Sequence, residues 1–138
     1  MAASTPDRPS GTMTLMSFDT VITATATGGL RGPERRPAQM LAEQTYDGGL
    51  SVHDDDNAER LGLAGAPIEG PTHFSQIDPL AVAHFGEQWF ERGCVSAHFQ
   101  TMVVEGESVV AELSPTDSAD VARIDAAKGD GTPVLPGP

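Results

Sequence analysis

The stretch "VHDDDNAERLGLAGAPIEGPTHF", residues 52–74, decides how this chain folds, because it carries the start and stop signals of one helix and the start of a second. Asp56 stands where it can cap the first helix, and Glu59, three residues later, completes a capping-box pattern. Gly62 and Leu63 occupy the positions at which a left-handed glycine and an apolar follower end a helix. The stretch therefore predicts one or two helical turns, then a turn rich in glycine and proline that leads into a longer helix.

A long amphipathic helix is predicted over residues 72–92. Its apolar face is formed by Ile77, Leu80, Ala81, Phe85 and Trp89. Pro79 interrupts the pattern, which predicts a kink or two abutting helices, and Gly93 ends it. Trp89 and Phe90 are expected to be core residues rather than ligand-stacking residues.

Strand patterns flank this helix on both sides. The strands are expected at residues 15–27, 94–104, 108–114, 119–127 and from 133 onward. Turns are expected at residues 105–107 and 128–132, and the alternation slips between Val121 and Ile124, which indicates a bulge. Strand, loop, helix and an antiparallel meander together predict an α+β protein with one helix packed against one sheet.

Length and charge limit the class of protein. The 138 residues suit one domain, and we expect a disordered tail over residues 1–13 followed by a single domain over residues 14–138. The formal charge of −12 argues against a nucleic-acid or anionic-membrane surface. The one basic cluster, "RGPERRP" at residues 31–37, is expected to be a solvated loop.

The cysteine count and hydropathy indicate a cytoplasmic protein. Cys94 is the single cysteine, which excludes an intrachain disulfide, and we expect it to be a half-buried structural thiol. No apolar run approaches the roughly 18 residues of a membrane span, and the first residues have no apolar signal core. The sequence thus predicts a soluble, cytoplasmic protein that contacts neither membrane nor nucleic acid.

The order and punctuation of these elements resemble the hotdog fold, in which an antiparallel sheet wraps around one central helix. Within that superfamily the chain is similar to the MaoC-like hydratases and dehydratases, which include R-specific enoyl-CoA hydratases, and to a divergent actinobacterial-type branch of them. The matching positions are His53, Asp55, Ala58, Leu61-Gly62, Gly65, Pro67-Ile68 and Gly70, followed by Trp89, Gly93, Phe99 and Gly106. The resemblance covers residues 15 to 114, and it implies a truncated last strand at the end of the chain.

The resemblance implies hydration or dehydration of an enoyl or 3-hydroxyacyl thioester, with no cofactor. This reaction needs a base for water, an acid for the α-carbon and a donor for the thioester oxygen. The family places an Asp five residues before its His, where this chain has Gly48, and an Asn-Pro pair where it has Leu50-Ser51. Asp47 lies one position further back, and a local bulge would bring it near His53. His53 and Asp47 are the implied catalytic residues.

The start of the long helix is the implied substrate-binding site. Backbone N–H groups near Gly70 and Thr72 would receive the thioester oxygen, aided by the helix dipole. Pro71 suits the first helical turn because its missing N–H has no intrahelical partner to lose. His73, just inside the helix, is the other histidine that can face a pocket, although a packing role also fits it.

Other readings of the same residues remain open. His53 and Asp55 could share a metal, but no second His–acid cluster has ligand spacing, so no metal is expected. A thioesterase would use a carboxylate near the helix start, and Glu69 is the candidate. A non-catalytic hotdog subunit that binds an acyl chain also fits the missing Asp and Asn-Pro positions.

The expected partners follow from the resemblance. The ligand would be an acyl or enoyl thioester of CoA or of a carrier protein, lying along the central helix. A small, half-covered sheet has an edge to protect, so we expect a homodimer, or a heterodimer with another hotdog subunit, formed through that edge.

Overall fold

The computed structural model describes residues 18–40 and 52–137, so the expected tail at residues 1–13 and the candidate Asp47 lie outside the described residues. The elements are β1 (Thr23–Ala24), β2 (Leu30–Arg31), α1 (Asp55–Arg60), α2 (Gly70–Phe85), α3 (Gln88–Arg92), β3 (Val109–Pro115), β4 (Ala122–Lys128) and β5 (Pro133–Leu135). Together they form the predicted α+β arrangement.

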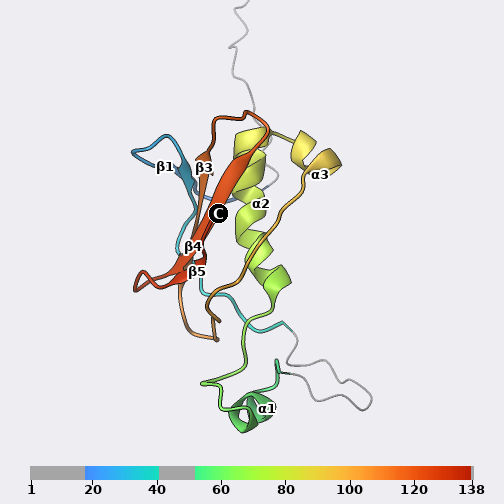
Figure 1. Cartoon of the computed structure of the whole chain (residues 1–138), viewed down its shortest axis with the longest axis vertical. Coiled ribbons are helices and arrows are strands. Elements are labelled where there is room, and N and C mark those ends of the chain that lie inside the picture. Colours follow the sequence, from blue (N-terminus) through green and yellow to red (C-terminus); the bar gives the residue numbers. More distant parts are fainter. Residues whose placement is uncertain (1–17, 41–51, 138) are drawn as a thin grey trace, which may run out of the picture.

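The strands form one antiparallel sheet in the order β1-β2-β3-β4-β5. Its centre is the hairpin of β3 and β4, which pair from Val109–Lys128 to Pro115–Ala122. Helix α2 lies against this sheet, and α1 lies apart from it at one end of the molecule (Figure 1). In the sequence, helix α2 comes between β2 and β3, as the sequence pattern predicts.

The core lies between α2 and the sheet. Strand β3 alternates buried and partly buried residues, because a strand facing a helix on one side buries every second side chain. Val109 and Leu113 are fully buried from β3, and Ile77 and Leu80 meet them from α2. Burial of each such side chain stabilises the fold by about 1.5–3 kcal/mol before the entropy cost of ordering it.

Helix α1 is capped one position differently from the prediction. Asp54, whose backbone is extended, accepts a hydrogen bond from the Asn57 N–H at 3.2 Å, so the predicted cap at Asp56 is wrong. Asp56 is already inside the first helical turn. The predicted end is confirmed: Gly62 has a φ of 78°, and the Leu63 N–H donates to the Ala58 carbonyl at 2.9 Å.

The long helix breaks at Gly86 and not at Pro79. Gly86 has a φ of 77°, which turns the chain from α2 into the short α3, and Gly93 ends α3 as predicted. Pro79 is buried inside α2, where the flanking core contacts of Ile77 and Leu80 hold both halves of the helix in line.

The second predicted core residue of α3 is on the surface. The side chain of Phe90 is 57% exposed, so its expected core position is wrong, whereas Trp89 packs against the core. Phe90 lies near Phe18, with ring centroids 6.1 Å apart.

The predicted strand over residues 94–104 is extended chain without a ladder. The Gln100 N–H donates to the Val134 carbonyl at 2.9 Å, and Val104 forms a single bridge to Pro67. The neighbouring β5 has three residues, and one of them is a proline that cannot donate to a ladder. The side chains of residues 94–104 therefore differ in how deeply they are buried. Cys94 in this segment is exposed, so its expected half-burial is wrong.

Three smaller expectations are corrected in the sheet. The strand expected over residues 15–27 is regular only at Thr23–Ala24 among the described residues. The bulge lies between Ala126 and Ala127, where β4 meets β5, and not near Val121. The basic loop at 31–37 is partly structured, because Arg35 exchanges backbone hydrogen bonds with Val109 at 2.9 and 2.7 Å.

A partly buried ion pair fixes the turn that starts the β3–β4 hairpin. The ammonium of Lys128 lies 2.8 and 2.7 Å from the two carboxylate oxygens of Glu107, and the Val104 N–H donates to one of them at 2.9 Å. Burial alone would raise the pKa of Glu107, but these hydrogen bonds outweigh it and leave that pKa below its ordinary value. The ionised carboxylate is thus favoured in the folded state.

We expect Glu107→Gln to lower the free energy of unfolding by about 0.5–1 kcal/mol near neutral pH, a partly exposed pair being screened by water. Because the folded pKa is depressed, the loss should be full above the unfolded value of about 4.3 and should vanish as the pH falls through the folded value. Chemical denaturation from pH 3 to 7 measures it. Glu105→Gln, in the same turn, is the matched control, and an equal loss in both variants would contradict the pairing.

A close backbone approach at Gly29 predicts a second stability effect. A Cβ on this residue would lie 2.6 Å from the carbonyl oxygen of Leu113 in β3. We expect Gly29→Ala to destabilise the protein by about 1–3 kcal/mol, because backbone must move. At Gly65 the added Cβ would meet Val104 at an ordinary 3.6 Å, so Gly65→Ala is the control in thermal unfolding. Equal melting temperatures for the two variants would disprove the clash.

Candidate functional site

The start of α2 carries a buried carboxylate. Glu69 precedes the helix in extended conformation, and its side chain makes no capping hydrogen bond, since it turns inward. It is 6% exposed. Its Oε1 accepts the Met40 N–H at 2.9 Å, whereas Oε2 is buried with no hydrogen-bond partner among the described residues. An unpaired buried polar atom costs about 1–3 kcal/mol, so this oxygen is a candidate ligand contact.

One helical turn later lies a buried imidazole. His73 is 5% exposed, and its ring packs against Phe99 at a centroid distance of 5.5 Å. Its Nδ1 is buried and has no hydrogen-bond partner in the described part of the chain. Burial lowers the pKa of His73, and the negative charge of Glu69 opposes this by raising it. Because burial has the larger effect, the pKa of His73 is lowered and the neutral ring is favoured.

A third orphaned atom extends the same stripe. The Oε1 of Gln76 is also buried without a partner among residues 18–40 and 52–137. Positions 69, 73 and 76 are spaced four and three residues apart, which places their side chains on one face of a helix. The N-cap and the first two turns of α2 thus carry three buried polar atoms without a hydrogen-bond partner among the described residues.

His53 lies beside the turn that enters α2. It is half-buried, and its Nδ1 is 2.8 Å from the carbonyl oxygen of Pro67. Because a carbonyl only accepts, Nδ1 carries the proton and Nε2 carries the lone pair of the neutral ring. Gln39 Nε2 donates to the same carbonyl at 2.8 Å, so two side chains converge on Pro67, two residues before Glu69.

The other sequence-predicted residues divide between site and scaffold. Gly70 begins α2 in contact with Phe99, where an added Cβ would lie 3.3 Å from that ring. The Thr72 N–H donates to the Glu69 carbonyl at 3.1 Å and is therefore already used within the turn. Asp55 accepts the Ala66 N–H at 3.0 Å, which ties α1 to the turn before Pro67 and gives Asp55 a structural role.

Two members of this cluster were not predicted as site residues. Phe99 was expected in a strand and as a position of the resemblance, and its ring lies against His73 and, at 6.2 Å, against Phe74. Gln76 was not considered at all. Its spacing from Glu69 and His73 was the available signal, because polar residues repeating at helical spacing within an apolar pattern mark a buried polar stripe.

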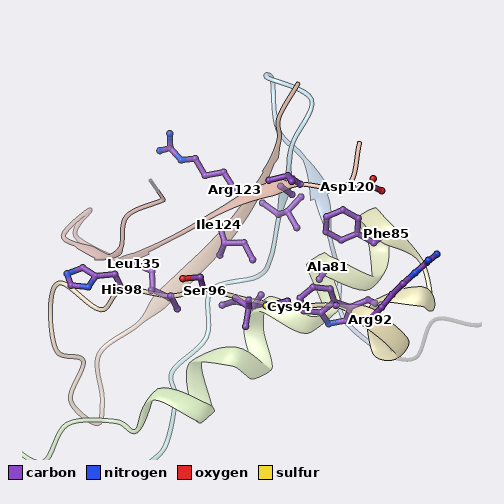
Figure 2. A pocket seen from close by; sticks show the side chains of 18 of the residues that line it. Ala81, Phe85, Arg92, Cys94, Ser96, His98, Asp120, Arg123, Ile124 and Leu135 are labelled. Carbon is purple, nitrogen blue, oxygen red and sulfur yellow. The ribbon is translucent and has the colours of Figure 1, made fainter. Parts of the chain in front are cut away.

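A cavity of about 810 Å³ lies along the other half of α2. Its walls come from α2, α3, the extended segment 93–98, the start of β4 and the end of β5 (Figure 2). The apolar side chains that line it include Ile77, Ala81, Phe85, Trp89, Ile124 and Leu135. Glu69, His73 and Gln76 are not among its lining residues, and the first residue of α2 that lines it is Ile77. Its size is within the range of small-molecule sites.

The described residues contain neither a metal-ligand cluster nor a membrane-spanning helix. No group of three or more His, Cys, Asp or Glu side chains there is arranged to hold a metal ion. No helix in that part of the chain is long and apolar enough to cross a membrane.

Comparisons of the whole chain with protein-family models, with curated proteins and with solved structures found no match. The resemblance to MaoC-like proteins therefore rests on the residues quoted above.

The state of His73 can be tested directly. We expect its imidazole to titrate below the ordinary value of about 6.5, because burial disfavours the charged ring. In Glu69→Gln the pKa should fall further, since the carboxylate that supports the cation is gone. NMR titration of the histidine ring protons, assigned with His73→Gln, measures both. An unchanged or higher His73 pKa in Glu69→Gln would contradict the electrostatic contact.

Proposed function

We propose that this protein is a MaoC-like hotdog protein that binds an acyl or enoyl thioester and adds water to the enoyl form. The fold supports the first half of this proposal: one central helix is inserted between β2 and β3 of a five-stranded antiparallel sheet. The site supports the second half. Its main support is the buried carboxylate of Glu69, whose Oε2 has no partner among the described residues and lies at the start of α2.

The chemistry assigns one role to each group. The Nε2 of His53 takes a proton from water, while its Nδ1–H donates to the Pro67 carbonyl and orients the ring. The water oxygen bonds to the β-carbon, and the π electrons move to the thioester oxygen. The imidazolium then returns the proton to the α-carbon as the enolate collapses. One water is added and the base is regenerated.

The start of α2 stabilises the charge that develops on the thioester oxygen. Pro71 has no N–H and the Thr72 N–H is already bonded, so the donor in the first turn is the N–H of Gly70, aided by the helix dipole. Glu69 Oε2 would accept a hydrogen bond from the attacking water. Glu69 thus takes the place that the resemblance gives to Asp47, whose own role stays a prediction.

The same geometry supports a second candidate, an acyl-thioester hydrolase. In that reaction Glu69 would activate water for attack on the thioester carbonyl, and the thiol would leave. The specific observation in its favour is that Glu69 is the most buried carboxylate of the cluster and lies directly before the helix N-terminus. Hydration would depend on both His53 and Glu69, whereas hydrolysis would depend chiefly on Glu69.

The proposed partners are a thioester of CoA or of a carrier protein and a second hotdog chain. The extended segment 93–103 lies beside β5 without a ladder on its outer side, and it exposes Val95, Phe99 and Met102. Such an apolar, unpaired edge favours association through the sheet, as a homodimer or a heterodimer.

Turnover of trans-2-butenoyl-CoA and trans-2-octenoyl-CoA, beside that of octanoyl-CoA, separates the two activities. We expect the parent to hydrate an enoyl substrate and His53→Ala or Glu69→Gln to lower kcat/KM by about 10²–10⁴-fold. His84→Ala and Glu91→Gln are controls of the same residue types outside the site. Hydrolysis of octanoyl-CoA that persists in His53→Ala would establish the second candidate. If the folded parent turns over none of the three substrates, both proposed activities are wrong and a non-catalytic binding subunit remains.

A further inference from the structure

The cavity along the second half of α2 has features that the thioester site does not use. It begins beyond Gln76 and reaches α3, away from Glu69 and His53. One wall is aromatic: the rings of Phe85 and Trp89 are stacked, with centroids 6.1 Å apart and an interplanar angle of 15°. The indole N–H of Trp89 donates to Asp78 at 3.0 Å, so the polar atom of that ring is satisfied and its face is left for apolar contact.

The charges around the cavity differ from those of the chain. Its lining includes two arginines, Arg92 and Arg123, against one acid, Asp120, and so has a formal charge of +1 in a protein of −12. The lining of this cavity therefore favours an anionic ligand, in contrast to the net charge of the chain.

The two arginines are not equivalent. Arg123 is paired with both carboxylate oxygens of Asp125 at 3.0 and 2.9 Å, so its charge is already compensated. Arg92 donates to the neutral amide of Gln88 at 2.6 Å and forms no ion pair with a described residue. Figure 2 shows Arg92 at the α3 edge of the cavity near Phe85. A ligand carboxylate at this edge would form an ion pair with the guanidinium of Arg92.

We propose that the cavity binds a single-chain amphiphile with a carboxylate head group, a free fatty acid in chemical class. The head contacts Arg92 at the α3 edge, and the chain lies over Phe85 and Trp89 toward Ala81 and Ile77. This site is separate from the thioester site, and its binding does not depend on the proposed hydration or hydrolysis. Asp120 at the same rim disfavours a second negative charge, which selects a monoanionic head over a phosphate.

The chain provides its own reporter, because Trp89 is the single tryptophan and lines the cavity. We expect decanoate, below its micelle concentration, to change the tryptophan emission saturably with one site per chain. Decan-1-ol and decylammonium, of equal chain length, should bind more weakly, by between about threefold and tenfold, since they lack the charge that Arg92 attracts.

Two variants and one control decide the assignment. Arg92→Gln should reduce decanoate affinity to that for decan-1-ol and leave decan-1-ol binding unchanged. Arg60→Gln, an exposed arginine at the end of α1, makes the same charge change away from the cavity and should alter neither affinity. Ala81→Phe, checked for folding by circular dichroism, should abolish all three titrations by filling the cavity.

Different results would contradict the existence of the site and its recognition of a carboxylate. Absence of saturable decanoate binding to the full chain would remove the site. Equal affinities for decanoate, decan-1-ol and decylammonium, or an Arg92→Gln effect matched by Arg60→Gln, would remove the carboxylate recognition. If Ala81→Phe fails to fold, the comparison of Arg92→Gln with Arg60→Gln still tests the carboxylate recognition, because Arg92 is exposed and outside the core.

Discussion

The packing of α2 on β3 is the contact on which the rest of this structure depends. Ile77 and Leu80 meet Val109 and Leu113, and these are among the most deeply buried side chains described. Since the sheet is antiparallel and short, the helix is its main apolar cover. The same contact fixes which side chains lie at each end of α2: a polar cluster at its start, and an aromatic wall toward its end.

Much of this arrangement could be predicted from the sequence because the decisive signals are local. Gly62 ends α1 with a φ of 78°, and the turn at Gly106, with a φ of 92°, connects the extended segment to β3 as expected. The predictions that failed depend on a neighbour. Residues 94–104 alternate like a strand, but the three-residue β5 with its proline supplies too few partners. Asp54 displaced Asp56 as cap because three consecutive acids leave the helix start ambiguous by sequence.

Only part of the candidate site could be predicted from the sequence, for a related reason. His53 stands before three consecutive acids and Glu69 before the Gly70-Pro71 turn signal, which draws attention to both, and His73 follows closely. Glu69 Oε2, His73 Nδ1 and Gln76 Oε1 have no hydrogen-bond partner within residues 18–40 and 52–137, and their burial depends on distant segments such as Met40 and Phe99. A sequence records that a group is polar, but only the fold decides whether water can reach it.

Helix α3 has a consequence for the timescale on which the cavity exchanges its contents. It spans five residues, buries none of them, and lies between Gly86 and Gly93. A segment with so few buried contacts opens with a small fraction of the global unfolding free energy, and its amides exchange hydrogen with solvent through local fluctuation. The wall that carries Arg92 is therefore the most readily displaced part of the cavity, while the α2–β3 layer beneath it stays closed. We therefore expect local motion of α3 on a timescale of microseconds to seconds to change the shape of the cavity without disturbing the core.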